Sequence, residues 1–532
     1  MAIRTETLYS WASQLDRRLI VAAGLSYVIA VAIYRLYFSP IAHIPGPKIA
    51  ALTTWYAGYH DLIRGGQYVK VIAEMHKKYG PIVRIRPDSL HINDHNFVGT
   101  LYSQDPRHRR ERYETNLKSF QAPYSILGTQ DHDLHRSRRA VLSPYFSQQS
   151  VRGLSNVVNK TMLNLLRRMD GWAAAGQPIQ MNLPLRAATK DVIQSYALGG
   201  GTTPCLDIED CNAAFFDMMI PGRVSHLGPH MYWLAKLLYL IPPSIMRIMN
   251  PRMGSFVEFI SWIYAQIKQV KHSQNPPPTT KDSSRSSIFH EILASSIPES
   301  EKSDARIAQE AGILLIAGTD TLAATLAAIM YEVLADRNLL NRLRDELKAV
   351  IPEADTAIDP AKLDKLPLLN AIIQEGLRMH PGVVLRQDRV CPDETLVYTY
   401  PDDSKRQITI PRGTAMGMTA PLLNRCPEIY GNDPDVFRPQ RYIDDPGLQK
   451  YLFSFGKGGR QCIGINLAWE EMKVFVAGVF RKYDLYDEAR AGKQGPTLEL
   501  YETSREDVAM YADFVTPGFV PGSQGMRVRI RR

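Results

Sequence analysis

Cys462 lies in the segment FGKGGRQCIG, residues 455–464, where its spacing from an arginine and several glycines is typical of a metal ligand. Glycines at 458, 459 and 464 lack Cβ, so the backbone there accepts φ > 0 and can approach a flat group closely. After Cys462, apolar residues recur at three- and four-residue intervals, which predicts that the sulfur lies at a helix start. Such a position favours the thiolate, the form that binds metal.

The alternative for a lone cysteine is a small buried hydrophobic residue. However, the pattern Phe-x-x-Gly-x-Arg-x-Cys-x-Gly is complete and resembles the signature of the cytochrome P450 monooxygenases, whose haem b iron is bound by a cysteine thiolate. The resemblance implies that Cys462 is the proximal iron ligand and that the cofactor is haem b. Arg460 is expected to pair with a haem propionate, and Phe455 is expected to shield the sulfur from water.

A second motif lies in the apolar segment 312–330, GILLIAGTDTLAATLAAIM. Its length suits a membrane span, but Asp320 at its centre would be costly in lipid, so a buried central helix is predicted. Its run AGTDT resembles the family's oxygen-activating helix, which implies that Thr321 holds a water or proton near the oxygen site and that Asp320 relays protons. The alternative is a polar cluster in an ordinary core helix. Leu322 replaces a second hydroxyl that is frequent in the family.

Further motifs indicate how a haem would be held. Glu375 and Arg378 share a helix face, and Arg441 completes the Glu-Arg-Arg cluster that the resemblance implies as a scaffold behind the haem. His135 and Arg139 align with the family's Trp-x-x-x-Arg haem contact, with histidine in place of tryptophan. The imidazole N–H can still donate to a propionate, although histidine could add pH dependence. Arg389 is another propionate candidate, with a surface arginine as the alternative.

Composition limits the class of protein. The chain has 532 residues, 45% of them hydrophobic, which is ample for one large core. Its five cysteines show neither the density of a disulfide scaffold nor paired metal spacing, so the main body is expected in a reducing compartment. The net charge of +9 is scattered among acids, which argues against nucleic-acid binding. A basic surface also suits anionic membranes or an acidic redox partner.

The N-terminal part predicts membrane attachment. Residues 19–38, LIVAAGLSYVIAVAIYRLYF, are long enough to cross a bilayer, and the competing view is a cleaved signal peptide. The expected organisation is an N-terminal tail at 1–18, a transmembrane anchor at 19–38, a Pro-rich hinge at 39–48 and a haem-thiolate catalytic domain at 49–532. Basic residues nearly balance across the anchor and do not fix its orientation. The resemblance implies the endoplasmic reticulum membrane, a single pass and a cytosolic catalytic domain.

The remaining pattern predicts a mainly α fold with small β-sheets, and the resemblance implies the cytochrome P450 fold with one N-terminal transmembrane helix. A hairpin is expected at 80–93, two strands at 395–416 and a closing strand at 527–530. Helices are expected at 132–142, 150–170, 254–271 and 338–350. The polar, proline-rich segment 272–287 is expected to be an exposed loop.

The predicted function is a monooxygenase that hydroxylates or epoxidises an apolar small molecule, in the manner of fungal secondary-metabolite members of the family that act on terpenoids or polyketides. No Gly-x-Gly-x-x-Gly opens a βαβ unit, so electrons should come from NADPH through a separate reductase, NADPH-cytochrome P450 reductase, with cytochrome b5 as a further candidate partner. The alternatives are a reductase-independent isomerase or dehydratase of the same fold and a non-catalytic haem protein. The substrate and the position of attack are not encoded in any recognisable pattern.

Overall fold

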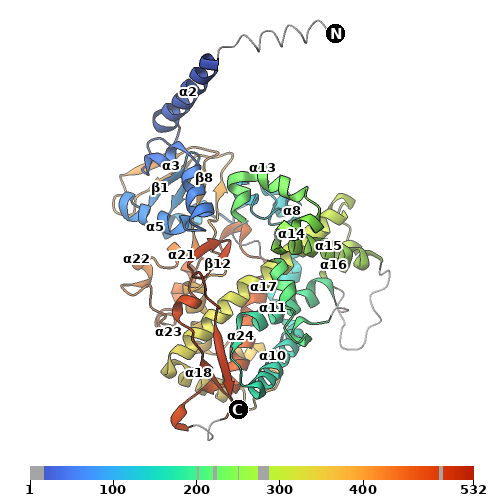
Figure 1. Cartoon of the computed structure of the whole chain (residues 1–532). Helices are drawn as coiled ribbons and strands as arrows, with labels where there is room; N and C mark the ends of the chain where they lie inside the picture. The colour runs from blue at the N-terminus through green and yellow to red at the C-terminus, as the bar shows by residue number, and fades with distance from the viewer. Residues whose placement is uncertain are drawn as a thin grey trace.

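Helix α17 (Asp304–Ala335) runs through the centre of the helix-rich part of the protein (Figure 1). The computed structural model describes residues 17–199, 203–219, 225–249, 251–272, 287–490 and 495–531. The side chain of Ser303 accepts a hydrogen bond from the Arg306 N–H and caps the helix start, as short polar side chains do. Because α11 (Asn182–Leu198), α20 (Pro367–Met379) and α24 (Ile465–Lys482) all pack against α17, it forms the axis of the core.

The helices outside this central group vary from one turn to six. The longer ones are α2 (Arg17–Ile33), α5 (Tyr68–Tyr79), α8 (His132–Leu142), α10 (Ser155–Ala175), α13 (Leu227–Tyr239), α15 (Pro251–His272) and α18 (Arg337–Val350). The shorter ones are α3 (Lys48–Leu52), α4 (Trp55–Gly58), α6 (Val98–Leu101), α7 (Glu114–Leu117), α9 (Gln148–Arg152), α12 (Ala213–Met219), α14 (Pro243–Met249), α16 (Ile288–Ala294), α19 (Pro360–Leu363), α21 (Ala420–Leu423), α22 (Pro427–Tyr430) and α23 (Gln440–Asp444).

The strands form small sheets. One sheet, in the order β1-β2-β8-β5-β3, contains β1 (Ile82–Arg86), β2 (Ser89–Ile92), β8 (Ala415–Gly417), β5 (Arg389–Val390) and β3 (Glu111–Arg112). A second, in the order β4-β13-β10-β9, contains β4 (Ile179–Gln180), β13 (Arg527–Arg531), β10 (Thr497–Leu500) and β9 (Asp484–Leu485). Two-stranded pairs join β6 (Leu396–Thr399) to β7 (Gln407–Ile410) and β11 (Ala512–Phe514) to β12 (Thr516–Gly518).

The mainly α fold with small sheets is therefore confirmed, and so are most predicted elements. The hairpin at 80–93 is the antiparallel pair β1 and β2, and the closing strand is β13. The helices predicted at 132–142, 254–271 and 338–350 correspond to α8, α15 and α18. The prediction of one helix over 150–170 is wrong, because the backbone leaves helical geometry at Leu154 and separates α9 from α10. Most of the predicted loop at 272–287 lies outside the described residues.

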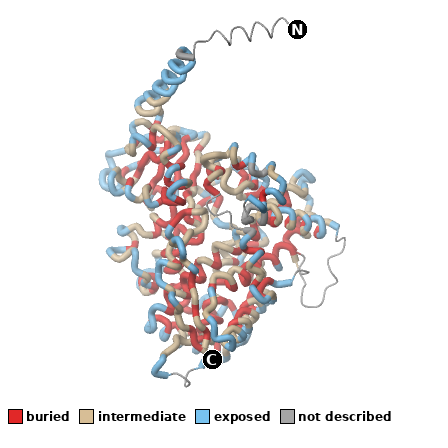
Figure 2. The backbone as a smooth tube through the Cα atoms, viewed as in Figure 1, coloured by how far each residue is buried: buried red, intermediate tan, exposed pale blue. Residues whose placement is uncertain are grey.

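Two apolar helices differ in their surroundings. The helical segment Leu19–Phe38 has none of its apolar window buried and projects from the body, whereas α17 has 61% of its window buried (Figure 2). The prediction that α17 is a core helix and not a membrane span is confirmed. Both helices have the length and composition to cross a membrane, and only the first leaves its apolar surface uncovered. That segment is thus a candidate transmembrane span.

Candidate active site

The segment that carries Cys462 folds as a tight loop before α24. The Cys462 N–H donates to the Phe455 carbonyl at 2.9 Å, and the Gln461 N–H donates to the Gly458 carbonyl at 3.0 Å. Gly458 has φ +77°, and a Cβ there would lie 2.3 Å from the carbonyl oxygen of Tyr102. The positive φ agrees with the sequence, and Gly458 also permits close packing against the backbone of Tyr102.

Many protein atoms lie around Cys462, yet its side chain is exposed because it lines a partly open cavity. Burial raises the pKa of Cys462, while the backbone N–H of Gly464 and the charge of Arg139 act in the opposite direction. The prediction that the helix start makes the thiolate the favoured form is therefore wrong for the protein without metal, since desolvation outweighs it. A coordinated metal ion would reverse this balance, because metal binding deprotonates a thiol outright.

The cavity has a volume of ≈ 590 Å³ and brings the two main sequence motifs together. Cys462 and Phe455 line it from the cysteine loop, and Asp320 and Thr321 line it from α17. Most of its remaining wall is apolar, as expected for a small-molecule site. Thus a candidate metal ligand and a candidate proton-carrying pair, 141 residues apart in sequence, border one cavity.

Thr321 donates its hydroxyl to the carbonyl of Ala317 at 2.8 Å. This is the back-bond expected from the sequence, although α17 remains helical throughout. Gly318 lines the cavity, and a Cβ there would lie 3.0 Å from the Ile193 side chain of α11. Gly318 therefore also permits the close packing of α11 on α17.

Asp320 is held by a residue that the sequence did not reveal. Arg186 of α11 donates to the Asp320 carboxylate at 2.7 Å, and both side chains are largely buried. Burial raises the pKa of Asp320, and the Arg186 guanidinium opposes that shift. The carboxyl group is thereby placed in a setting where its protonation is sensitive to small rearrangements, which is suited to proton relay.

Three arginines border the cavity near the cysteine loop: Arg112, Arg389 and Arg460. Burial lowers the pKa of all three, and neighbouring arginines lower it further at Arg112 and Arg460. Nearby acidic groups oppose the shift at Arg389 and Arg460, and Tyr102 also opposes it at Arg389. The pKa of Arg460 falls to about 9. Arg389 is 3% exposed, so the alternative of a surface arginine is wrong.

These arginines differ in their existing partners. Arg460 donates to the carbonyls of Thr129 at 2.6 Å and Gln130 at 2.5 Å. Among the described residues, the Nε of Arg112 has no hydrogen-bond partner. Arg112 was not identified from the sequence, where it is one of several basic residues in RHRRER. The cluster thus presents excess buried positive charge to the cavity, a setting that favours an anionic group.

His135 and Arg139 of α8 lie behind this cluster and are not among the residues that line the described cavity. Arg139 donates to the Gln461 carbonyl at 2.7 Å and so braces the cysteine loop. Burial, with Arg460 and Arg112 nearby, lowers the pKa of His135 to about 2. The imidazole is therefore neutral over the physiological range, and the pH dependence considered for it is not expected.

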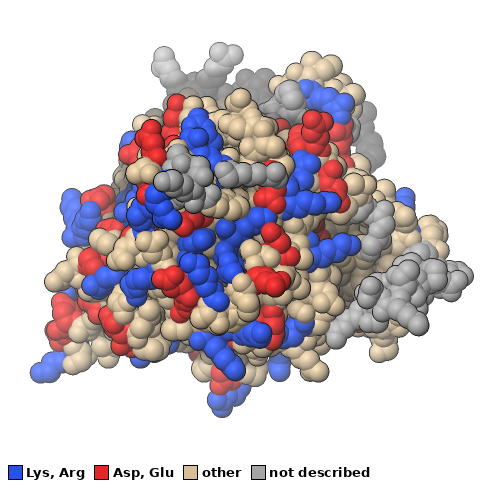
Figure 3. Space-filling view, turned by 90° about the horizontal axis from the view of Figure 1, so that it is seen from below, with Lys and Arg blue, Asp and Glu red and all other residues tan. Residues whose placement is uncertain are grey.

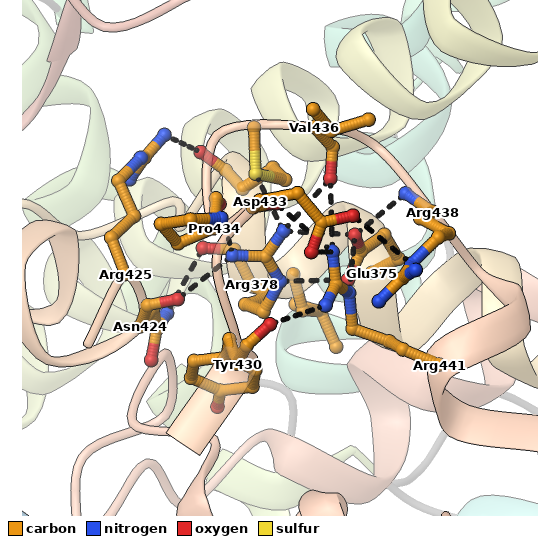
Figure 4. A network of polar contacts seen from close by, with 12 residues as sticks. Glu375, Arg378, Asn424, Arg425, Tyr430, Asp433, Pro434, Val436, Arg438 and Arg441 are labelled. Carbon is orange, nitrogen blue, oxygen red and sulfur yellow. Dashed lines mark hydrogen bonds and ion pairs between the residues drawn. The ribbon is translucent and has the colours of Figure 1, made fainter. Parts of the chain in front are cut away.

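The structure brings Glu375, Arg378 and Arg441 together in one buried network (Figure 4). Arg378 donates to both Glu375 carboxylate oxygens, at 2.7 and 2.8 Å, and Arg441 donates to one of them at 3.1 Å. The backbone N–H of Arg438 adds a bond of 2.7 Å. Both arginines also donate to backbone carbonyls, so the charged groups of this cluster have hydrogen-bond partners, as buried charges require.

Glu471 of α24 also lines the cavity and was missed. Its side chain is buried, one carboxylate oxygen has no partner among the described residues, and burial raises its pKa well above the usual range. The sequence did contain a signal for a buried acid. Glu471 lies four residues after Leu467 and four before Phe475, which places an acidic residue on the apolar face of the predicted helix.

Comparison with known proteins gives the family to which this chain belongs. The family model described as Cytochrome P450 matches residues 47–497. The chain belongs to the cytochrome P450 family. A solved structure, retinoic acid bound cyanobacterial CYP120A1, superposes with a TM-score of 0.64 over 86% of this chain and 93% of that chain, at 19% identity, which supports the fold.

Several curated fungal relatives match along nearly their whole length. Cytochrome P450 monooxygenase tpcC of Cochliobolus heterostrophus is 38% identical, covering 96% of this chain and 96% of the relative. Cytochrome P450 monooxygenase astB of Talaromyces wortmannii is 37% identical, covering 95% and 96%. Tryptophan 6-hydroxylase fscE of Fusarium equiseti is 32% identical, covering 94% of each. The chain is thus an enzyme of the monooxygenase family, and membership implies a haem cofactor.

The described residues fit haem on chemical grounds. Cys462 supplies a sulfur ligand at the cavity wall, and the cavity offers apolar surface for a porphyrin. The orphaned Nε of Arg112 and the neighbouring Arg389 and Arg460 supply positive charge for two propionates. Phe455 lines the cavity beside the cysteine loop, where it can limit water access to the sulfur.

Proposed function

We propose that this protein is a haem-thiolate monooxygenase that inserts one oxygen atom from O₂ into an apolar small molecule, by hydroxylation or epoxidation. The observation that carries the proposal is that Cys462, Asp320 and Thr321 border the same largely apolar cavity. The haem, when bound and reduced, supplies oxygen activation and transfer. The chain supplies the sulfur ligand, the binding site, the proton donors and a dry environment. In this proposal residues 49–532 form one catalytic domain.

The named residues have separate roles in this proposal. Cys462 is the iron ligand, and Arg112, Arg389 and Arg460 hold the propionates, while His135 and Arg139 support that region from α8. Thr321 holds a water or proton beside the reacting oxygen, and Asp320 exchanges protons with it. Glu375, Arg378 and Arg441 form the scaffold. The support is geometric: the buried bonds and cavity positions described above.

The substrate class is an apolar secondary metabolite, terpenoid or polyketide, in a fungal biosynthetic pathway. Two features support this: the mainly apolar cavity wall and the relatives named as fungal monooxygenases. The relative named as tryptophan 6-hydroxylase makes an indole a useful comparison substrate. Intact Asp320 and Thr321 favour oxygen insertion over reductase-independent isomerisation or dehydration.

Electrons are proposed to come from NADPH through a separate cytochrome P450 reductase, with cytochrome b5 as a further candidate donor. The sequence shows no dinucleotide-binding motif of its own. The face turned away from the anchor interleaves Lys and Arg with Asp and Glu, and no single-sign stripe crosses it (Figure 3). That mixture suits a transient protein partner better than nucleic acid.

The protein is proposed to be anchored in the endoplasmic reticulum membrane by residues 19–38, with its catalytic domain in the cytosol. Large apolar side chains are exposed beyond the candidate anchor. Trp55 lies on α4, Ile63 lies on the adjoining π-helical turn Tyr59–Ile63, and Trp233 lies on α13. Ile63 is 71% exposed and Trp233 is 63% exposed. Such side chains gain free energy at a lipid interface. The candidate anchor and these side chains support membrane attachment.

The decisive experiment combines the purified protein with reductase, NADPH and isotopically labelled dioxygen. Terpenoid, polyketide, fatty-acid and indole compounds that shift the haem spectrum are then assayed as substrates. The expected product carries one labelled oxygen and requires NADPH and reductase. Cys462→Ala should lose both the product and the red-shifted carbon-monoxide band of haem-thiolate proteins. Product without NADPH, or a surviving band in the variant, would contradict the proposal.

A further inference from the structure

Helix α13 covers the cavity. Ser225, just before the helix, and Ala235 within it line the cavity, whereas Trp233 is 63% exposed and Leu237 is 50% exposed. One side of this segment therefore faces the ligand space and the other faces outward. A ligand that approaches through this part of the surface must pass α13.

Residues 225–237 form the roof of the cavity, and this roof rests on a buried polar junction. The Nε2 of His230 lies 3.0 Å from the Asp61 carboxylate, and the Nδ1 of His226 lies 4.0 Å from the same oxygen. The Nε2 of His226 lies 2.6 Å from the Asp513 carbonyl, so that nitrogen carries the proton and donates it. The three side chains are at least nine-tenths buried. Each bond joins a different part of the chain to the roof.

The junction ties the roof to the frame of the cavity. Asp61 belongs to the π-turn Tyr59–Ile63, and Asp513 belongs to β11. Phe514 and Val515, which follow Asp513, line the cavity. The β11 segment is itself held in place, because the Asp513 N–H donates to the Gly66 carbonyl at 2.9 Å. The histidines therefore connect a cavity cover to two supports.

Charge and backbone geometry strengthen this interpretation. His230, His226 and Arg386 hold the pKa of Asp61 below its usual value despite burial, while burial lowers the pKa of His230. A neutral imidazole thus donates to a carboxylate. The helix breaks at Met231, where φ is −139° and ψ is 51°. The change of direction lets His230 reach Asp61 while Ala235, one turn later, reaches the cavity.

We propose that Asp61, His226 and His230 form a latch that holds the α13 roof closed and limits the rate at which small apolar ligands enter and leave the cavity. The inference goes beyond the proposed function, on which it rests only in taking this cavity as the ligand site. A latch of this kind acts on ligand passage in both directions and leaves the contacts of the bound ligand unchanged.

The test measures passage directly with 4-phenylimidazole, an azole that binds haem iron and shifts its absorption, in rapid-mixing experiments on the holoenzyme. Asp61→Asn should raise the association and dissociation rates together by about five- to tenfold, the size of one ordinary hydrogen bond, with the Kd changed less than about twofold. Unchanged rates, or a change in dissociation alone, would overturn the latch.

A matched control is available. His380 and Glu332 form a second buried pair, 2.9 Å apart, between α17 and the end of α20. Glu332→Gln makes the same chemical change as Asp61→Asn and should leave both rates unaltered. Similar acceleration in both variants would indicate general loosening and refute the assignment. The carbon-monoxide spectrum of each variant confirms a folded haem protein.

Two further measurements keep the latch testable independently of catalysis. In a double variant that carries Asp61→Asn and His230→Leu, the rate increases of the two single variants should not add. Additive increases would show that Asp61 and His230 act separately. Amide hydrogen exchange should accelerate at 225–237 in Asp61→Asn and remain unchanged in α17. This second readout needs no enzyme turnover, so failure of the proposed monooxygenase activity leaves it interpretable. Unchanged exchange at 225–237 would contradict the proposal.

Discussion

Two buried arginine clusters beside the candidate haem site differ in one respect. In the Glu375 cluster, Arg378 and Arg441 share a carboxylate, and hydrogen bonding to Glu375 keeps the pKa of Arg378 raised despite desolvation. In the cavity cluster, burial and mutual repulsion lower the pKa of Arg112 and Arg460. The first cluster is completed by the chain itself, whereas the second carries charge suited to an anion from outside the chain. In our proposal, the same residue type therefore serves as scaffold in one place and as ligand site in the other.

The largest expected effect comes from breaking the completed cluster. Glu375→Ala leaves two buried guanidinium groups without their carboxylate, which should lower the free energy of unfolding by about 3 to 5 kcal/mol. Denaturant titration measures the loss, and the haem-thiolate spectrum should disappear with it. Glu74→Ala, which removes an exposed pair with Lys77, should change stability by less than about 1 kcal/mol. A Glu375→Ala protein as stable as this control would show that the cluster is not a scaffold.

The second effect sharpens the comparison, because removing a charge from the incomplete cluster should act in two opposite directions. Arg112→Leu is expected to stabilise the haem-free protein by on the order of 1 kcal/mol, since it removes a buried, poorly paired cation. The same variant should lose haem roughly tenfold faster to a haem acceptor, because a propionate partner is gone. Thermal unfolding measures the stability of the haem-free form, and haem-transfer kinetics measure the rate of haem loss. A lower stability of the haem-free variant, together with faster haem loss, would place Arg112 among the structural residues instead.

These two clusters also show what the sequence can and cannot predict. The cysteine segment, the α17 motif and the Glu375 pair were identifiable because their key residues lie within a few positions of one another. Arg186 was missed because it meets Asp320 only through packing across 134 residues. Arg112 was missed for the same reason, since nothing distinguishes it from its basic neighbours. The break at Leu154 was missed because the apolar period continues across it.

A third prediction concerns the acid in the same cavity. Burial raises the pKa of Glu471, so the folded protein favours its neutral form and the unfolded chain does not. Stability should therefore fall as pH rises above the unfolded value of about 4.3, towards the folded pKa. Glu471→Gln removes this dependence. The free energy of unfolding of the variant should exceed that of the parent by more at pH 8 than at pH 5, in denaturant titrations at both values. An equal difference at both pH values would be inconsistent with a neutral buried acid.

The smallest effect on stability is expected at Thr321, which belongs to neither cluster. Thr321→Ala should change the free energy of unfolding by only about 0.5 kcal/mol, because only one side-chain bond to a backbone carbonyl is lost. Haem should remain bound, while hydrogen peroxide formed per NADPH should rise several-fold at the expense of product. Measuring NADPH, peroxide and product in one assay tests this. Unchanged coupling would argue against proton delivery by Thr321, and loss of haem would assign it a structural role.

The junction between the anchor and the body sets a limit on where a shortened protein can begin. Arg84 is 2% exposed, and its guanidinium donates to the Arg35 carbonyl at 2.8 Å and lies 3.4 Å from the Ser39 hydroxyl. Arg35 in turn donates to the Leu52 carbonyl at 2.6 Å. A truncation after residue 33 keeps these bonds, whereas one that starts at residue 40 removes the Arg35 and Ser39 partners of this buried cation and leaves it the Pro87 carbonyl. Purification without detergent is therefore best attempted with a chain that begins at residue 34, with Tyr34 and Tyr37 replaced by polar residues.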